Sequence, residues 1–158
     1  MKNAIITGAG GDIGACITEL AVNLGYSIAA IDVQPDSVNE LADRLDNVIP
    51  VIADITDPKS VRNAFDALGA VPDLLVNNAG LVRFGPLEDL AVQDFQDVVN
   101  VNLVGSFIVA KEAAARMKTV GSGAIINITS MGGIHPAPGS GAYGATKSGL
   151  AQMTQLMS

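Results

Sequence analysis

The chain has 158 residues, of which 49% are hydrophobic and 16% charged, and its formal net charge is −7. This length predicts one domain with a substantial apolar core. The acidic balance excludes a nucleic-acid binder, because phosphates require a basic surface.

Targeting features are also missing from the sequence. No uninterrupted apolar run approaches the ~18 residues of a membrane span, and the N-terminal apolar run is broken at Gly8, too early for a signal peptide. The single cysteine, Cys16, cannot form an internal disulfide and fits a reducing compartment. We therefore expect a cytoplasmic protein without a membrane partner.

Short β-rich segments alternate with amphipathic helical patterns along the chain. Strands are predicted at residues 4–7, 27–32, 48–53, 73–77 and 124–129. Between the first four, apolar residues recur at helical spacing: Ile13, Ile17, Leu20 and Leu24, then Val38, Leu41 and Leu45, then Val61, Phe65 and Leu68. Asp57 before Pro58 predicts the start of the third helix. This alternation predicts an α/β fold: a doubly wound parallel sheet, Rossmann-like, in one domain over residues 1–158.

Two longer helices complete the pattern. The first runs from about Val92 to Lys118, with one predicted apolar stripe made of Leu103, Phe107, Ala110, Ala114 and Met117. The second begins near Gly141 and has no capping glycine or proline before Ser158. The last strand would also form an apolar sheet edge. We therefore expect a domain that is incomplete at its C-terminus, with further strands and a substrate-covering segment to follow.

A glycine-rich turn, Thr7-Gly8-Ala9-Gly10-Gly11-Asp12-Ile13-Gly14, follows the first strand and opens the first helix. Such a turn lets the backbone approach a pyrophosphate, whose charge the helix N-terminus favours. Asp32 ends the second strand 18 residues after Gly14, close to the ~20 expected for an acid that binds ribose. Because no Arg or Lys lies beside it, Asp32 favours NAD and disfavours NADP, although a solvated turn residue is the alternative interpretation.

The chemical residues lie near the other end. Tyr143 and Lys147, four apart on a predicted helix, project from one face. A free phenol ionises near pH 10, and an ammonium within ~4–6 Å can lower such a pKa by ~1–3 units. Ser130 closes the fifth strand segment and could hold a substrate oxygen. Together with the glycine turn, these groups predict hydride transfer to or from a carbonyl carbon.

Each of these residues has a structural alternative. The Tyr143–Lys147 pair could be an exposed helix pair. Ser130 could cap the following Met131-Gly132-Gly133 turn, and Asn102 could be a buried amide that satisfies backbone groups.

Five motifs in order and at the right spacing resemble the short-chain dehydrogenase/reductase family: the glycine turn, Asn77-Asn78-Ala79-Gly80, Asn102, Ser130 and Tyr143 with Lys147. The resemblance spans the whole chain and implies interconversion of a secondary alcohol and a ketone with NAD. It implies that Tyr143 is the general acid/base, that Lys147 also holds the nicotinamide ribose, that Ser130 orients the substrate oxygen, and that Asn102 holds a water linking Lys147 to solvent. No metal is implied. The implied cofactor-binding residues are Gly8, Gly11, Asp12, Ile13, Gly14, Asp32, Asp54, Ile55, Asn78, Ala79, Gly80, Tyr143 and Lys147.

Asp12 departs from the family, whose commonest turn has glycine at that position. The spacing of Gly8, Gly11 and Gly14 is more similar to the family's extended members. We interpret Asp12 as a helix cap; the alternative is that its charge weakens pyrophosphate binding. The same spacing hints at epimerisation or dehydration of a sugar nucleotide instead.

The rival from another class is a catalytically silent nucleotide-binding or oligomerisation module, favoured by the early end of the chain. Small residues keep the last helix slim, which with the Leu103–Ala110 stripe suggests the face by which family members form homodimers or homotetramers. These small residues are Gly141, Ala142, Gly144, Ala145 and Gly149. The sequence does not reveal which alcohol or ketone is the substrate.

Overall fold

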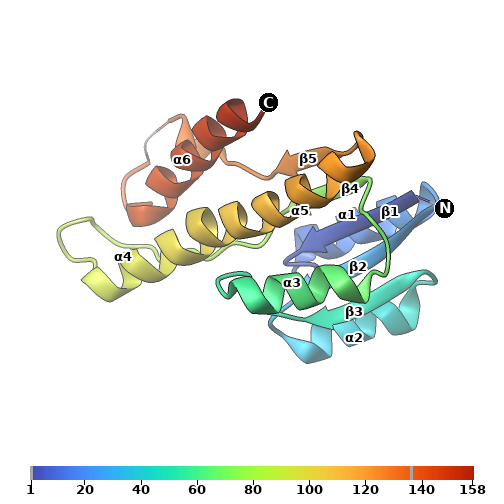
Figure 1. The fold of residues 1–158 in the computed structure, drawn as a ribbon. Coiled ribbons are helices and arrows are strands. Elements are labelled where there is room, and N and C mark those ends of the chain that lie inside the picture. The colour runs from blue at the N-terminus through green and yellow to red at the C-terminus, as the bar shows by residue number, and fades with distance from the viewer. Residues whose placement is uncertain (1, 136) are drawn as a thin grey trace.

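Five parallel strands form the centre of the fold, in the order β3-β2-β1-β4-β5 (Figure 1). In the computed structural model, which describes residues 2–135 and 137–158, they are β1 (Lys2–Thr7), β2 (Tyr26–Asp32), β3 (Val48–Ile52), β4 (Leu74–Asn77) and β5 (Ala124–Asn127). The register pairs Ile5 with Ala29 on one side and with Leu75 on the other. The strand order therefore reverses between β1 and β4, which is where doubly wound sheets bind ligands.

Helices cover both faces of the sheet, as predicted. They are α1 (Asp12–Asn23), α2 (Pro35–Arg44), α3 (Pro58–Ala67), α4 (Val92–Val99), α5 (Ser106–Val120) and α6 (Gly141–Met157), with a π-helical turn η1 (Asn100–Gly105) between α4 and α5 and a 3₁₀ turn η2 (Met131–Gly133) after β5. Asp57 caps α3 by accepting hydrogen bonds from the amides of Lys59 and Ser60. The doubly wound prediction is confirmed.

Two apolar clusters lie on opposite faces of the sheet. Ile5 of β1 packs with residues of α3 and α5, including Phe65 and Val109, while its neighbour Ile6 faces α1 and α2. Alternate residues of the central strands are thus buried on both sides, which explains why these strands are apolar without alternation. β5, at the edge of the sheet, is different, because Ile126 remains 48% exposed.

The predicted apolar stripe of α1 is wrong at Ile13, Leu20 and Leu24, and only Ile17 of the stripe packs against the apolar cluster on this face. Leu20 and Leu24 are exposed, and the residues turned toward the sheet are the small Gly14, Thr18 and Ala21. The glycine turn brings α1 close to the strands, and only short side chains fit between them. Side-chain size, and not helical spacing alone, decides which face is buried here.

The stripe predicted for the long helix is also shifted. Phe107 is 48% exposed, and the buried positions are Asn102, Ser106, Val109 and Ala113, with Ala110 and Met117 shared between prediction and structure. The wider π turn between α4 and α5 changes the phase of the helix. Leu103 instead packs against α6 within the same chain, where a Cβ added to Gly149 would lie 3.3 Å from its Cδ2.

By length and composition alone, the continuous helical segment Val92–Val120 could cross a membrane. Such a signal is weak, because the core helix of a globular domain gives it too. Here Val109, Ala110 and Ala113 are fully buried against the sheet. We interpret the segment as a core helix.

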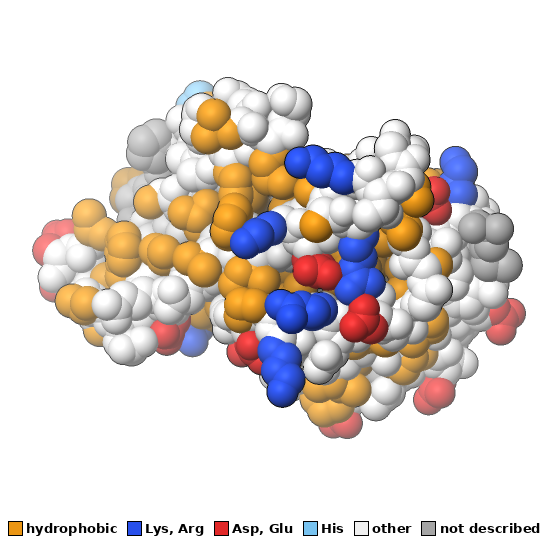
Figure 2. Space-filling view, in the orientation of Figure 1, with side chains coloured by type: hydrophobic (Ala, Val, Ile, Leu, Met, Phe, Trp, Pro, Cys, Tyr) orange, Lys and Arg blue, Asp and Glu red, His pale blue; other side chains and the backbone are white. Residues whose placement is uncertain are grey.

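Charged side chains gather over α3 and α5 (Figure 2). Arg116 of α5 bonds Asp66 of α3 at 2.6 Å and Glu112 at 2.8 Å, and its guanidinium lies 5.3 Å from the centre of the Phe65 ring. Burial opposes the charge of Arg116, but these hydrogen bonds outweigh it and raise its pKa. The network fixes α3 to α5 on the face that covers β1 and β4.

Candidate active site

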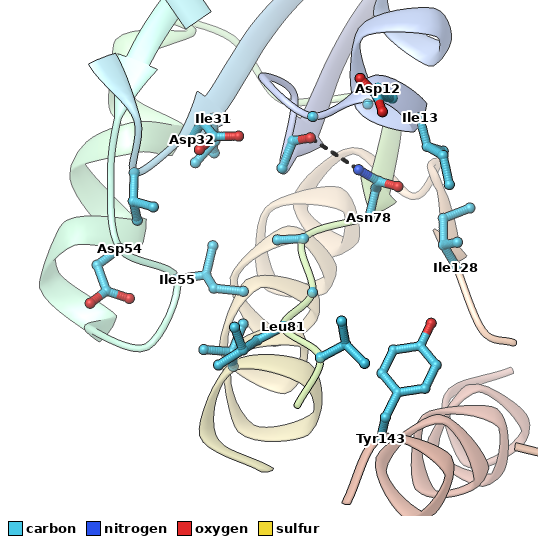
Figure 3. Close-up of a pocket in the computed structure, with 18 of the residues that line it drawn as sticks. Asp12, Ile13, Ile31, Asp32, Asp54, Ile55, Asn78, Leu81, Ile128 and Tyr143 are labelled. Atoms are coloured by element: carbon cyan, nitrogen blue, oxygen red, sulfur yellow. Dashed lines mark hydrogen bonds between the residues drawn. The ribbon is translucent and has the colours of Figure 1, made fainter. Parts of the chain in front are cut away.

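A cavity of about 830 Å³ opens at the carboxyl ends of the strands, where the strand order reverses. Its size is within the range of small-molecule and cofactor sites. All residues that the sequence assigned to the cofactor line this one cavity, including Tyr143 and Lys147 from the far end of the chain. Figure 3 shows Asp32 and Asp54 on the side of β2 and β3 and Tyr143 on the opposite side.

Some lining residues carried no sequence signal. Ile31, Val33 and Ala53 flank the predicted strand ends, so the strand prediction itself could have found them. The others lie in loops or on elements that the sequence did not place near the cavity. They are Leu81, Val82, Phe84, Val101 and Ile128.

The glycine turn has two positions that no other residue can occupy. Gly8 has a φ of +64°, and a Cβ there would lie 2.7 Å from the Cα of Ala79. A Cβ on Gly14 would lie 2.8 Å from the Cα of Ala9 and collide with the carbonyl of Gly8. At Gly11 the only neighbour is that carbonyl oxygen at 3.6 Å. The turn is thus tightly packed at Gly8 and Gly14 and open at Gly11, which lines the cavity.

Hydrogen bonds to the end of β4 hold this turn in place. The side-chain amide of Asn78 donates to the carbonyls of Thr7 and Gly8 at 3.2 and 3.1 Å. In return, the hydroxyl oxygen of Thr7 accepts from the amides of Asn78 and Ala79, each at 3.1 Å. The two loops that meet at the switch point therefore form one polar unit.

The carboxylate of Asp32 is fixed at the cavity wall. One oxygen accepts from the amide of Gly10 at 2.9 Å and the other from the amide of Gln34 at 3.0 Å. Asp54, by contrast, turns one oxygen to the amide and hydroxyl of Thr56. Among the lining residues that the structure describes, Lys147 alone carries a positive charge.

The predicted capping role of Asp12 is wrong. Gly11 is the N-cap residue of α1, and no side chain caps this helix. Asp12 is the first helical residue, is exposed, and lines the cavity. Its carboxylate benefits from the positive end of the helix dipole, but it remains at the wall where a pyrophosphate would lie.

Ile55 marks the contact between the cavity wall and the π-helical turn. It is 6% exposed, and a Cβ on Gly105 would lie 2.8 Å from its side chain. The absence of a side chain at Gly105 lets the long helix pass directly behind this wall.

Lys147 lies beside Tyr143 and is almost fully buried. Its ammonium donates to the carbonyl of Ile128 at 2.7 Å and lies 5.6 Å from the centre of the Tyr143 ring. Burial lowers the pKa of Lys147 from its ordinary value of 10.5, because desolvation penalises the charged form. The exposed-pair alternative does not hold, since Lys147 is only 4% exposed.

Asn102 is a buried amide with backbone partners. Its Oδ1 accepts from the amide of Leu81 at 2.7 Å, and its Nδ2 donates to the carbonyl of Leu81 at 2.8 Å and to the hydroxyl of Thr146 at 3.2 Å. Both side-chain donors are therefore engaged. This is the structural alternative foreseen from the sequence, and support of a water by Asn102 stays a prediction.

Ser130 caps the η2 turn, which was its structural alternative. Its oxygen accepts from the amide of Gly132 at 3.1 Å, and Ser130 is not among the residues that line the cavity. The hydroxyl hydrogen remains available as a donor, so the cap does not conflict with a substrate contact.

Close packing joins η2 to the helix that carries Tyr143 and Lys147. A Cβ on Gly133 would lie 2.8 Å from the backbone carbon of Lys147, and the Ser148 hydroxyl donates to the Gly133 carbonyl. The turn that Ser130 caps is thereby packed against the part of α6 that contains Tyr143 and Lys147. The described part of the chain contains no group of three or more His, Cys, Asp or Glu side chains that could bind a metal ion.

Comparison with known proteins gives a consistent result. A family model described as short chain dehydrogenase matches residues 2–158. D-threitol dehydrogenase of Mycolicibacterium smegmatis is 33% identical over 163 residues, which cover 99% of this chain and 63% of that protein. A 3-oxoacyl-[acyl-carrier-protein] reductase of Thermotoga maritima is 32% identical over 162 residues, which cover 98% of this chain and 65% of that protein.

Solved structures agree. The crystal structure of NAD+-bound xylitol dehydrogenase superposes with a TM-score of 0.93 at 28% identity, over 99% of this chain and 63% of that one. A 3-oxoacyl-[acyl-carrier protein] reductase from Brucella melitensis superposes with a TM-score of 0.94 at 28% identity, over 99% of this chain and 62% of that one. The chain thus spans somewhat less than two thirds of the length of these proteins.

Proposed function

This chain belongs to the short-chain dehydrogenase family, and we propose that it is an NAD-dependent oxidoreductase that interconverts a secondary alcohol and a ketone. One observation carries the proposal: Tyr143 and Lys147 line the same cavity as the glycine turn and Asp32. A proton-transferring pair and a dinucleotide cradle are thus within one site.

The residues of the cavity fit a dinucleotide. The open position at Gly11, at the start of α1, suits a pyrophosphate. The fixed carboxylate of Asp32 suits the ribose hydroxyls of the adenosine half. At the other side, Lys147 would hold the nicotinamide ribose.

The charge around Asp32 supports NAD over NADP. A 2′-phosphate beside Asp32 would meet a carboxylate without a neighbouring Lys or Arg in the cavity lining. We expect NADH to bind at least about tenfold more tightly than NADPH, and Asp32→Asn to reduce that preference about tenfold, since it removes the charge but keeps an acceptor oxygen. Fluorescence titration with both dinucleotides measures this, and tighter binding of NADPH to the wild type contradicts it.

The chemistry divides between cofactor and chain. When bound, NADH supplies the hydride for the carbonyl carbon, and NAD+ accepts it in the reverse direction. Tyr143 donates a proton to the carbonyl oxygen, or takes one from the alcohol, while the hydroxyl of Ser130 orients that oxygen. The Lys147 ammonium stabilises the phenolate that remains on Tyr143.

The test compares the two tyrosines of the chain. Tyr143→Phe should lower turnover of small ketones by about 10²–10⁴-fold and leave the affinity for NADH within about twofold of wild type. Tyr26→Phe, on β2 and outside the cavity lining, should leave both unchanged. Undiminished turnover by Tyr143→Phe would refute the assignment.

The comparisons lend no support to a catalytically silent module, because the relatives reported above are named as dehydrogenases or reductases. Epimerisation of a sugar nucleotide likewise has no counterpart among them. Turnover by the wild-type chain separates these alternatives from the proposal directly.

We also propose that the protein forms a homodimer or homotetramer. Val104 of η1 and Phe107 at the start of α5 are 41% and 48% exposed, and η1 contacts α6. Phe107→Glu should shift the mass measured by light scattering toward that of a monomer, whereas Val120→Glu, at the far end of α5, should not. Equal masses for wild type and Phe107→Glu would argue against this face.

A further inference from the structure

Two threonines of α6 make the same pair of hydrogen bonds. Thr146 accepts from the Nδ2 of Asn102 at 3.2 Å and donates to the carbonyl of Tyr143 at 2.8 Å. Thr154, two turns later, accepts from the Nδ2 of Asn127 at 2.9 Å and donates to the carbonyl of Leu150 at 2.7 Å. Each hydroxyl thus joins α6 to an asparagine on a different element.

The two connections differ in what they touch. Thr146 lies directly before Lys147 and donates to the carbonyl of Tyr143, so it is part of the turn of α6 that contains both residues proposed to transfer and stabilise the proton. Its partner Asn102 grips both the amide and the carbonyl of Leu81, which lines the dinucleotide cavity. The hydroxyl of Thr146 therefore connects the Tyr143 turn, through the side chain of Asn102, to Leu81 in the cavity lining by hydrogen bonds.

Thr154 connects α6 to the sheet instead of to the cavity. Its partner Asn127 is on the edge strand β5 and accepts from Asn77 at 2.9 Å, and Thr154 does not line the dinucleotide cavity. The same helix thus contains a matched pair, with one hydroxyl tied to the site and one tied to the sheet.

We propose that Thr146 is a positioning residue, whose hydroxyl fixes the Tyr143–Lys147 turn of α6 against the Leu81 segment of the cavity. The inference rests on the proposed function, because it assigns a role in that reaction. It goes beyond the family motifs found in the sequence, which give no role to Thr146.

The physical reason is the burial of this connection. Thr146 is 2% and Asn102 0% exposed, so no water replaces a lost hydroxyl easily. Without it, one buried Nδ2 hydrogen of Asn102 loses its partner, and only the two hydrogen bonds to Leu81 remain to hold the Asn102 amide, which weakens the connection between Leu81 and α6. Displacing a reacting group by about 1 Å can cost about 10²-fold in rate.

The experiment compares Thr146→Val with Thr154→Val, which remove the same hydroxyl from the same helix. Thr146→Val should lower kcat about 10- to 100-fold and keep the NADH affinity within about twofold. Thr146→Ser should restore most of kcat, and Thr154→Val should leave it unchanged. Exchange of the Leu81 amide, measured by NMR, should be at least about tenfold faster in Thr146→Val than in Thr154→Val.

The outcomes separate this inference from the proposed function. An unchanged Leu81 exchange rate overturns the inference whether or not the wild type has turnover, and so does an unchanged kcat in an active enzyme. If the wild type turns over no alcohol or ketone, the proposed function fails, and Leu81 exchange alone decides whether Thr146 positions this segment. Should Thr146→Val not fold, Thr146→Ala and Thr154→Ala make the same comparison.

Discussion

The region proposed to bind the nucleotide (the nucleotide region: β1, α1, β2, β4 and their following loops) and the region proposed to carry out catalysis (the catalytic region: β5, η2 and the Tyr143–Lys147 turn of α6) are built differently. In the nucleotide region, strands are buried on both faces, and Asn78 and Asp32 fix their loops through neighbouring backbone groups. In the catalytic region, the strand pairs on one side only, Ser130 accepts from the amide of Gly132 two residues on, and Lys147 donates to the carbonyl of Ile128. The nucleotide region is thus held at the buried centre of the sheet by hydrogen bonds between loops that are far apart in the chain, whereas the catalytic region lies at the edge of the sheet.

The largest expected effect is at the glycine turn. Gly14→Ala should reduce the free energy of unfolding by about 3 kcal/mol, because its Cβ would meet backbone atoms that cannot give way. Gly11→Ala, where the nearest neighbour is 3.6 Å away, should cost less than about 1 kcal/mol. Denaturant unfolding measures both, and equal costs would show that the nucleotide region is not rigid in the way described.

Hydrogen exchange tests the difference between the regions directly. The amide of Ile28 bonds the carbonyl of Asn47 at 2.8 Å, and that of Ala124 bonds the carbonyl of Asp73 at 2.9 Å. Despite similar bonds, Ala124 at the exposed edge should exchange about 30-fold faster than fully buried Ile28. Similar exchange rates would mean that β5 is as stable as the centre of the sheet.

Lys147 allows a test by pH. Burial lowers its folded-state pKa below 10.5, so between that lowered value and 10.5 the unfolded chain binds more protons than the folded one. The free energy of unfolding of the wild type should therefore rise with pH across this window relative to Lys147→Met. Unfolding curves of both proteins from neutral pH to about pH 10.5 measure the difference, and a constant or falling difference contradicts the burial of a charged amine.

The smallest expected effect concerns Asp12. Removing this exposed carboxylate from the cavity wall by Asp12→Gly should tighten NADH binding about two- to fivefold, with the gain shrinking in high salt. Asp36→Gly, in the first turn of α2 and outside the cavity lining, should have no effect. Weaker binding by Asp12→Gly would instead show that Asp12 helps the cofactor.

Local patterns along the chain determined which parts of the fold could be predicted from the sequence. The strands, the glycine turn and the cap at Asp57 follow from local patterns, and the structure agrees with them to within two residues at strand ends. The buried faces of α1 and of the long helix could not be predicted, because Thr18 and Ser106 are buried by close approach and by a π turn, neither of which leaves a periodic signal.

The site shows the same limit. Motif order suggested which residues gather: residues of the glycine turn, residues 78–80, Tyr143 and Lys147 line one cavity, whereas Asn102 and Ser130 are not among its lining residues.

However, the contacts of Asn102 with Leu81 and Thr146 join residues that are 21 and 44 positions apart, so they depend on folding. The cap of Ser130 on the Gly132 amide is local, and the sequence predicted it as an alternative. A motif identifies a residue, but its distant hydrogen-bond partners emerge only in three dimensions.

The π turn between α4 and α5 has a practical consequence for redesign. Gly105 packs closely against Ile55 at the cavity wall, and Leu103 packs against Gly149 of α6. Asn102 forms hydrogen bonds with both Leu81 and Thr146. The six residues of η1 thus contact segments on both sides of the cavity. An engineer can exchange loops on either side, but lengthening or shortening 100–105 by one residue would misalign both at once.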